Sequence, residues 1–212
     1  MADAARRRAR LAVLISGGGT NLAALLAAIE ADPDFGAEIV VVGSDRAEAG
    51  GLDRARESGV PTVVQRLADH PDRRVWEDAL IRDLREREPD VVVLAGFMRL
   101  LSDVFLAHWP GRVINTHPSL LPAFRGANAV AEALDYGVKL TGSTVHLVDE
   151  QVDHGPVVAQ RAVEVHEDDT EQTLHERIRA VEHELLPACV KLLSQGRLEV
   201  SGRHVRVLEV PR

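Results

Sequence analysis

The chain has 212 residues, of which 45% are hydrophobic and 27% are charged, the balance of an ordinary globular protein. Its formal net charge of −8 argues against a protein that binds nucleic acid through general attraction to phosphate. Apolar runs stay well below the roughly 20 residues that cross a membrane, so we expect no membrane association. The single cysteine, Cys189, excludes an internal disulfide and is compatible with a cytoplasmic protein. Its apolar neighbours predict an inert thiol on a buried helix face.

Apolar runs rich in Val and Ile alternate with segments of helical period over the first part of the chain. The basic residues 1–10 are expected to form a disordered tail. Strands are predicted at 11–15, 38–44, 61–64, 90–94 and 112–116. Helices are predicted at 21–31, 47–58, 73–87 and 103–108. Strands without polar residues require a sheet covered on both faces, so this alternation predicts an α/β fold with a doubly wound, mostly parallel, Rossmann-like sheet.

The pattern changes after residue 120. The expected elements are a helix at 127–137, strands at 140–148 and 156–165, a long C-terminal helix at 171–194, and a terminal hairpin of 198–201 and 204–210. Asp169 or Thr170 is expected to cap the long helix, and Gly196 follows its end. The sequence contains no internal repeat or linker, which predicts a single domain over 1–212.

A glycine loop, Ser16 to Asn21, follows the first predicted strand and reads Ser-Gly-Gly-Gly-Thr-Asn. Glycines let a ligand approach the backbone, and the first-turn N–H groups of the next helix attract an anion such as phosphate. A dinucleotide fingerprint requires a third glycine where Leu22 stands, so a single phosphate on a small substrate fits better than NAD. A tight turn without a ligand remains the alternative. Asp45 is expected to cap the next helix rather than to bind a ribose.

A reactive segment, Val113 to Pro122, leaves the carboxyl end of a predicted central strand, which is the ligand-binding edge of open α/β sheets. Asn115 and His117 are two residues apart and therefore share one side of an extended chain. An amide can donate to a developing oxyanion, and an imidazole can move a proton near neutral pH. This pair suits a reaction at a carbonyl carbon, although a lone histidine is more often structural.

A second polar cluster, Asp149 to Pro156, follows a predicted strand that carries His146. Asp153 precedes a rigid Gly-Pro turn. If Asp153 faces His117, it favours the imidazolium and orders a water; otherwise it is a turn former. His146 shares a strand face with Thr144 and is a candidate pocket residue, whereas His154 fits a solvated turn. The scattered histidines lack zinc-motif spacing, so we expect no metal.

These motifs come in an order that resembles the phosphoribosylglycinamide formyltransferase family. The glycine loop, Ala95 to Leu101, Asn115 to Pro122, and Asp153 to Pro156 carry the resemblance, which covers about residues 11–202. It implies that 10-formyltetrahydrofolate donates a formyl group to the amine of phosphoribosylglycinamide, through a tetrahedral intermediate, in purine synthesis. We expect a monomer or a homodimer.

The resemblance also assigns roles by position. Asn115 matches the oxyanion donor, His117 the general acid, and Asp153 the residue that raises the histidine pKa and positions a water. The phosphate of the substrate is matched by Gly19, Thr20 and Asn21, with Arg73 nearby. The folate-binding residues are matched by Arg73, Met98, Arg99, Leu100, Leu101, Val148 and Val152. Glu182 matches a substrate-holding carboxylate, although its sequence surroundings alone predict a solvated side chain.

One segment departs from the family pattern, because Phe124-Arg125-Gly126 stands where Tyr-Pro-Gly is common. Arg125-Gly126 resembles the methionyl-tRNA formyltransferases, but those carry an additional RNA-binding domain that this acidic chain is expected to lack. Formyltetrahydrofolate deformylase shares the catalytic trio but normally has an extra N-terminal regulatory domain. Ten residues precede the first predicted strand here, so this relative is expected to fit poorly. A nucleotide-binding dehydrogenase or binding module is a further alternative, disfavoured by Leu22.

Overall fold

The computed structural model describes residues 7–209, and residues 1–6 and 210–212 lie outside this range. Its main sheet has seven strands in the order β3-β2-β1-β4-β5-β6-β7, and a separate hairpin joins β8 to β9. The strands are β1 (Ala9–Ile15), β2 (Ala37–Ser44), β3 (Thr62–Val64), β4 (Val91–Leu94), β5 (Val113–His117), β6 (Leu140–Leu147), β7 (Val157–Glu164), β8 (Leu198–Ser201) and β9 (His204–Val207). The helices are α1 (Thr20–Ala31), α2 (Gly51–Glu57), α3 (Arg73–Arg85), α4 (Asp103–His108), α5 (Ala129–Tyr136) and α6 (Glu171–Ser194), with a 3-10 turn at Leu67–Asp69.

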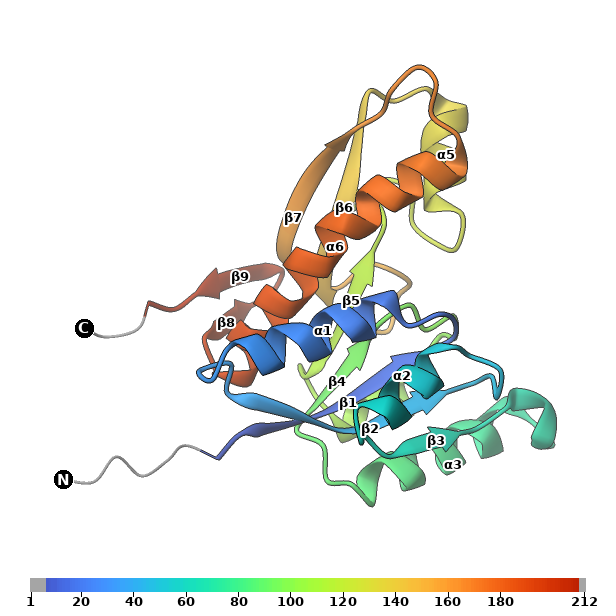
Figure 1. The fold of residues 1–212 in the computed structure, drawn as a ribbon, viewed down its shortest axis with the longest axis vertical. Helices are drawn as coiled ribbons and strands as arrows, with labels where there is room; N and C mark the ends of the chain where they lie inside the picture. Colours follow the sequence, from blue (N-terminus) through green and yellow to red (C-terminus); the bar gives the residue numbers. More distant parts are fainter. Residues whose placement is uncertain (1–6, 210–212) are drawn as a thin grey trace.

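Strands β1 to β5 pair in parallel, whereas β6 and β7 are antiparallel to their neighbours. The mostly parallel, doubly wound fold expected from the sequence is thereby confirmed. Helices cover both faces of the sheet, and α1 lies beside α6 along one of them (Figure 1). The long helix and the terminal hairpin are also confirmed, and Thr170 caps the helix by accepting a hydrogen bond from the N–H of Thr173.

Alternate residues of the central strands pack into two hydrophobic cores. Leu11, Val13 and Ile15 of β1 contribute to the core beneath α1, α2 and α6. Ala12 and Leu14 contribute to the opposite core, where Trp76 of α3 and Phe105 of α4 are buried. This division follows from the alternation of side chains along a strand. Because helices cover both faces of the parallel part of the sheet, ligands are expected to reach this part at the ends of its strands.

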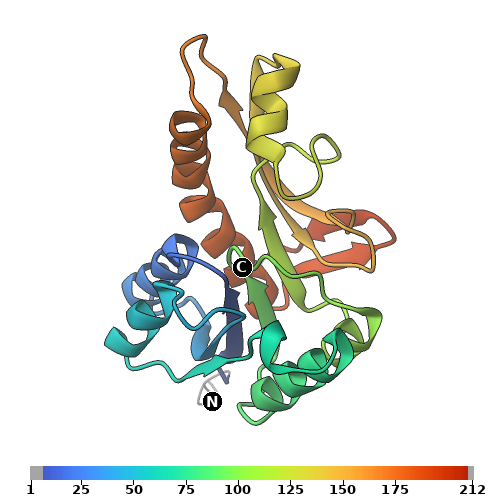
Figure 2. The same cartoon turned by 90° about the vertical axis from the view of Figure 1, so that its right-hand side faces the viewer.

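The antiparallel part of the sheet extends beyond the parallel part. Strands β6 and β7 rise together with α5 and the first half of α6 (Figures 1 and 2). A small separate core of Val130, Val163, Leu174 and Ile178 joins these elements. The carboxyl end of β5 therefore lies between the two parts of the molecule.

Three expectations need correction. Strand β1 begins at Ala9, so the expected tail over 1–10 is two residues too long, and its first six residues lie outside the described range. Helix α2 begins at Gly51 rather than at residue 47, because Gly51 docks onto the glycine loop through a hydrogen bond from its N–H to the Gly17 carbonyl. Asp45 does not cap α2: its carboxylate bonds Ser16 and Arg99 instead. The end of the expected hairpin at residue 210 lies outside the described residues.

Candidate active site

His117 is the last residue of β5, and both of its ring nitrogens have partners. Nε2 lies 2.8 Å from the Phe124 carbonyl, and Nδ1 lies 3.3 Å from Oδ2 of Asp153. A carbonyl can only accept a hydrogen bond, so Nε2 carries a hydrogen in the resting ring. Nδ1 is therefore the atom that gains and loses a proton, and it faces a carboxylate.

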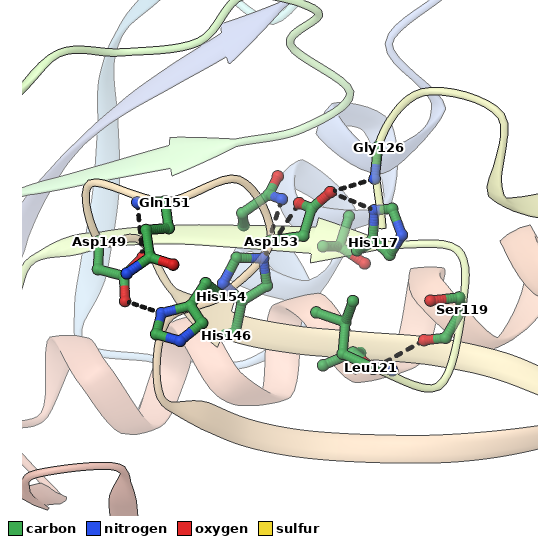
Figure 3. Close-up of polar contacts among 12 residues, drawn as sticks. His117, Ser119, Leu121, Gly126, His146, Asp149, Gln151, Asp153 and His154 are labelled. Atoms are coloured by element: carbon green, nitrogen blue, oxygen red, sulfur yellow. Dashed lines mark hydrogen bonds and ion pairs between the residues drawn. The ribbon is translucent and has the colours of Figure 1, made fainter. Parts of the chain in front are cut away.

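Asp153 lies between two histidines, His117 and His146 (Figure 3). Its Oδ2 also accepts a 2.9 Å hydrogen bond from the Gly126 N–H. The sequence-based expectation that Asp153 faces His117 is confirmed by this geometry. Both Asp153 and Phe124 adopt left-handed backbone conformations, with φ of 46° and 51°, which are uncommon for residues other than glycine. Backbone strain of this kind is found at functional sites, where the surrounding structure holds it in place.

Burial and nearby charges act in opposite directions on the pKa values of His117 and Asp153. Burial lowers the pKa of His117 below its ordinary value, and this outweighs the raising effects of the Phe124 carbonyl and of Asp153. The expected effect of Asp153, which is to raise the histidine pKa, is therefore present, but burial of the ring is the larger effect. Burial by itself raises the pKa of Asp153, but the neighbouring His146 ring and the hydrogen bond from Gly126 bring it below its usual range. An ionised Asp153 thus faces a largely neutral His117 near pH 7.

Asn115 is paired with His146 across the antiparallel β5–β6 ladder. Its Nδ2 lies 3.2 Å from Nε2 of His146, and Nδ1 of His146 lies 3.0 Å from the Leu147 carbonyl. The carbonyl requires a hydrogen on Nδ1, so Nε2 of the neutral ring accepts from the Asn115 amide. His146 therefore orients Asn115, and the second N–H of that amide remains for another acceptor.

The glycine loop lies at the amino end of α1. Gly19 has a φ of 70°, and a side chain on it would stand 2.6 Å from the Cα of Gly51, so this glycine is needed for the close approach of α2. Gly17 and Gly18 have open space where side chains would be. No side chain caps α1 at this end. The first-turn N–H groups of a helix have no partners within the helix, so an anion fits here.

A buried carboxyl group connects this loop to the other face of β5. Glu182 of α6 is 4% exposed, so the sequence-based expectation of a solvated side chain is wrong. It accepts hydrogen bonds from Asn21 Nδ2 at 3.2 Å and from Thr116 Oγ1 at 3.4 Å. Burial raises the pKa of Glu182, against the lowering effect of these two donors. The Asn21 side chain is therefore engaged, which leaves its backbone N–H for an anion.

The expected folate-binding residues come from three segments. Met98 and Leu100 are 63% and 55% exposed, and Arg73 donates a hydrogen bond to the Leu100 carbonyl. Arg99 Nε lies 2.7 Å from Asp45. The apolar side chains of Met98 and Leu100 are thus accessible at the surface.

The loop after β6 supplies the remaining two, Val148 and Val152. Val152 is 44% exposed. Val148 lines an open cavity of about 410 Å³ together with Leu106, Trp109 and residues 149–151. The catalytic candidates Asn115, His117 and Asp153 lie outside this lining. The cavity therefore marks the side of the loop that faces α4.

Comparison with known proteins accounts for this arrangement. A family model described as formyl transferase matches residues 9–190. The chain belongs to the formyl transferase family. The resemblance identified from the motifs is confirmed, since phosphoribosylglycinamide formyltransferase of Mycobacterium tuberculosis is 51% identical over 195 residues, which cover 92% of this chain and 89% of the relative.

Solved structures agree with this assignment. Glycinamide ribonucleotide transformylase 1 from Symbiobacterium toebii is 45% identical, with a TM-score of 0.93 over 96% of this chain and 95% of that one. Phosphoribosylglycinamide formyltransferase from Brucella melitensis is 46% identical, with a TM-score of 0.84 over 92% of this chain and 99% of that one. The human trifunctional purine biosynthetic protein adenosine-3 is 44% identical, but the match covers 19% of its length.

Two further observations concern what this formyl transferase contains. Between residues 7 and 209, there is no group of three or more His, Cys, Asp or Glu side chains that could hold a metal ion. Within the same range, none of the helices is both long and apolar enough to cross a membrane.

His146 is the member of the polar cluster whose contacts the sequence did not reveal. Its pairing with Asn115 depends on the antiparallel register of β5 and β6. The available signal was a histidine that shares a strand face with Thr144, two residues before it. His154, by contrast, pairs with Asp149 at 2.7 Å and is directed away from Asp153 (Figure 3). It therefore belongs to the loop rather than to the cluster.

Proposed function

We propose that this formyl transferase moves the formyl group of 10-formyltetrahydrofolate to the amine of 5′-phosphoribosylglycinamide. The products are phosphoribosyl-N-formylglycinamide and tetrahydrofolate, in purine biosynthesis. The observation that carries the proposal is the joining of Asn115, His117 and Asp153 in one cluster at the carboxyl edge of the sheet. Relatives named for this activity support the choice of substrates.

The reaction begins when the substrate amine attacks the formyl carbon, forming a C–N bond and a tetrahedral oxyanion. The free N–H of Asn115 donates to that oxyanion, a contact that contributes about 10²- to 10³-fold in rate in other enzymes. His146 holds the Asn115 amide in place for this contact.

Proton movement completes the transfer. Nδ1 of neutral His117 takes the proton that the attacking amine releases, and the imidazolium is stabilised by Asp153 at 3.3 Å. The same Nδ1 then protonates the folate nitrogen as its bond to the formyl carbon breaks. His117 thus acts first as a base and then as the general acid, and the lowered pKa suits the first of these steps.

Two binding regions lie around this cluster. Gly19, Thr20 and Asn21 bind the substrate phosphate through backbone N–H groups, and Glu182 holds the rest of that substrate. Arg73, Met98 to Leu101, Val148 and Val152 bind the folate. The exposed apolar side chains of Met98, Leu100 and Val152 support this second assignment.

We also propose the setting in which the enzyme works. It acts in the cytoplasm as a single formyltransferase domain, monomeric or homodimeric, and uses no nucleic acid and no metal. The formal net charge of −8 supports the absence of nucleic acid among its partners.

The deciding experiment is an amine-dependence assay. Formation of tetrahydrofolate from 10-formyltetrahydrofolate is followed with and without glycinamide ribonucleotide. We expect product only when the amine is present. Equal rates without it would replace the proposal with a formyltetrahydrofolate hydrolase. A third arm with methionyl-tRNA as the acceptor tests the remaining relative, and formylation of that RNA in place of the small amine would contradict our choice of substrate.

A further inference from the structure

Asp45 connects two segments that the proposed function assigns to different substrates. It follows the end of β2, and its side chain is fully buried. One oxygen, Oδ1, accepts a hydrogen bond of 2.6 Å from Ser16, which directly precedes the glycine loop. The other oxygen, Oδ2, lies 2.7 Å from Nε of Arg99, in the folate segment after β4. Each oxygen of the carboxylate is thus committed to one of two separate loops.

These contacts close into a ring. The N–H of Met98 donates to Ser16 Oγ at 2.8 Å, so the Ser16 hydroxyl hydrogen is directed to Asp45. The next residue, Arg99, returns to the same carboxylate. A backbone bond of 3.1 Å from the Ser16 N–H to the Gly96 carbonyl lies beside the ring. The glycine loop and the folate segment are therefore held together through one acidic side chain.

The direction of each hydrogen bond explains why an acid is required. Both Ser16 and Arg99 donate, and an arginine side chain has no acceptor. A carboxylate offers two acceptor oxygens, whereas an asparagine amide offers one oxygen and one NH₂ group. Asp45→Asn would therefore place a donor against Arg99 or force the Ser16 hydroxyl to turn and accept. In either case the anion that pairs with Arg99 is lost and the contacts of the ring are weakened.

We propose that Asp45 is a positioning residue that holds the two substrate loops at the separation formyl transfer requires. Its side chain is fully buried, so we assign it an effect through the two loops and not through contact with a substrate. The amine of the substrate whose phosphate is bound by one loop must reach the formyl carbon of the folate bound by the other. A misplacement of about 1 Å costs roughly 10² in rate elsewhere. This inference rests on the proposed function, because it takes from it which loop binds which substrate.

The test separates alignment from affinity. In Asp45→Asn we expect kcat to fall about tenfold or more, because the bound substrates are misaligned. Binding of glycinamide ribonucleotide alone, and of tetrahydrofolate alone, should stay within about threefold, since each loop remains intact. A kcat within about fivefold of the original, or a loss explained by weaker binding of one ligand, would overturn the inference.

A matched control lies at the opposite end of the sheet. Asp90 precedes β4 and accepts hydrogen bonds from the Arg10 N–H at 2.8 Å and from the Arg7 guanidinium at 2.7 Å. Asp90→Asn removes the same charge from a comparable pair of contacts, far from the substrate loops. The kcat of Asp90→Asn should be unchanged. An equal fall in the kcat of both variants would mean that Asp45 only stabilises the fold.

A second variant covers the case in which Asp45→Asn does not fold. Ser16→Ala removes one arm of the ring and keeps the ion pair with Arg99. We expect a smaller fall in kcat, about fivefold, again without loss of either ligand, and an unchanged kcat would overturn the inference. Absence of amine-dependent product in the unaltered enzyme is a different result, because it contradicts the proposed function itself.

Discussion

Strand β5 carries two polar clusters on opposite faces, and each contains a carboxyl group. On one face Asp153 contacts His117 and His146 and accepts the Gly126 N–H. On the other face Glu182 is bonded to Asn21 and Thr116. The pKa of Asp153 is lowered, because its neighbours His146, Gly126 and His117 together outweigh burial. Burial of Glu182 outweighs its two neutral donors and raises its pKa. The same type of group is thus given two different electrostatic states by its neighbours.

The two groups also affect folding stability in opposite senses. A lowered folded-state pKa means that Asp153 stabilises the fold above its unfolded pKa, and this contribution is lost as the pH falls. A raised folded-state pKa means that the contribution of Glu182 is fully present below its unfolded pKa and is lost as the pH rises. The surroundings of Asp153 therefore favour the charged carboxylate, and those of Glu182 favour the neutral carboxyl group. The following predictions test this difference.

The largest effect is expected at the proton-transferring residue of the first face. His117→Ala should lower kcat about 10³-fold, within the usual range for loss of a general acid–base group. Tetrahydrofolate binding should be largely unchanged, which is measured by titration of the variant. Turnover that survives this change would show that the proton moves by another route.

Removing the charge from the same cluster should have the next largest effect. Asp153→Asn should lower kcat roughly 10²-fold, because the imidazolium of His117 loses its anionic partner. The anion raises the pKa of His117, so its loss should move the acid limb of the kcat/KM profile to lower pH. A pH–rate profile of both proteins checks the sign. A shift to higher pH would mean that Asp153 does not act on His117.

The second face should respond differently to loss of charge. Glu182→Gln keeps an acceptor for Asn21 and should raise the KM for glycinamide ribonucleotide about tenfold, with little change in kcat. Because burial opposes ionisation of Glu182, the variant should be at least as stable at pH 8, and this advantage should shrink toward pH 4. Thermal unfolding at the two pH values measures it. A variant clearly less stable at pH 8 would contradict the argument.

The smallest effect is expected at an apolar position of the same helix. Cys189 is a buried free thiol whose pKa is raised by burial to about 12. The sequence-based expectation of an inert thiol agrees with this setting. Cys189→Ala should leave kcat and KM unchanged and lower the unfolding free energy by about 1 kcal/mol, the size of one small buried group. A change in KM for glycinamide ribonucleotide would mean that packing around Cys189 affects the position of Glu182 on the same helix.

Sequence patterns predicted most of the elements and part of the site. Period and turn residues placed the strands to within a few residues, because local geometry determines side-chain alternation. Asn115 and His117 were recognised together because they are two apart on one strand. The glycine loop was recognised from composition, but the packing of Gly19 on Gly51 was not, since it depends on two segments far apart in the chain.

The charge state of each buried group was decided by the tertiary structure. The sequence determined that a histidine, an amide and an acid stand at the ends of β5 and after β6. It did not determine that burial lowers the pKa of His117 or that Glu182 is buried. Nor did it determine that Asp45 bonds to two separate loops. The physical reason is that desolvation and hydrogen bonding depend on partners brought together by strand register and helix packing. Those partners are separated by tens of residues along the chain.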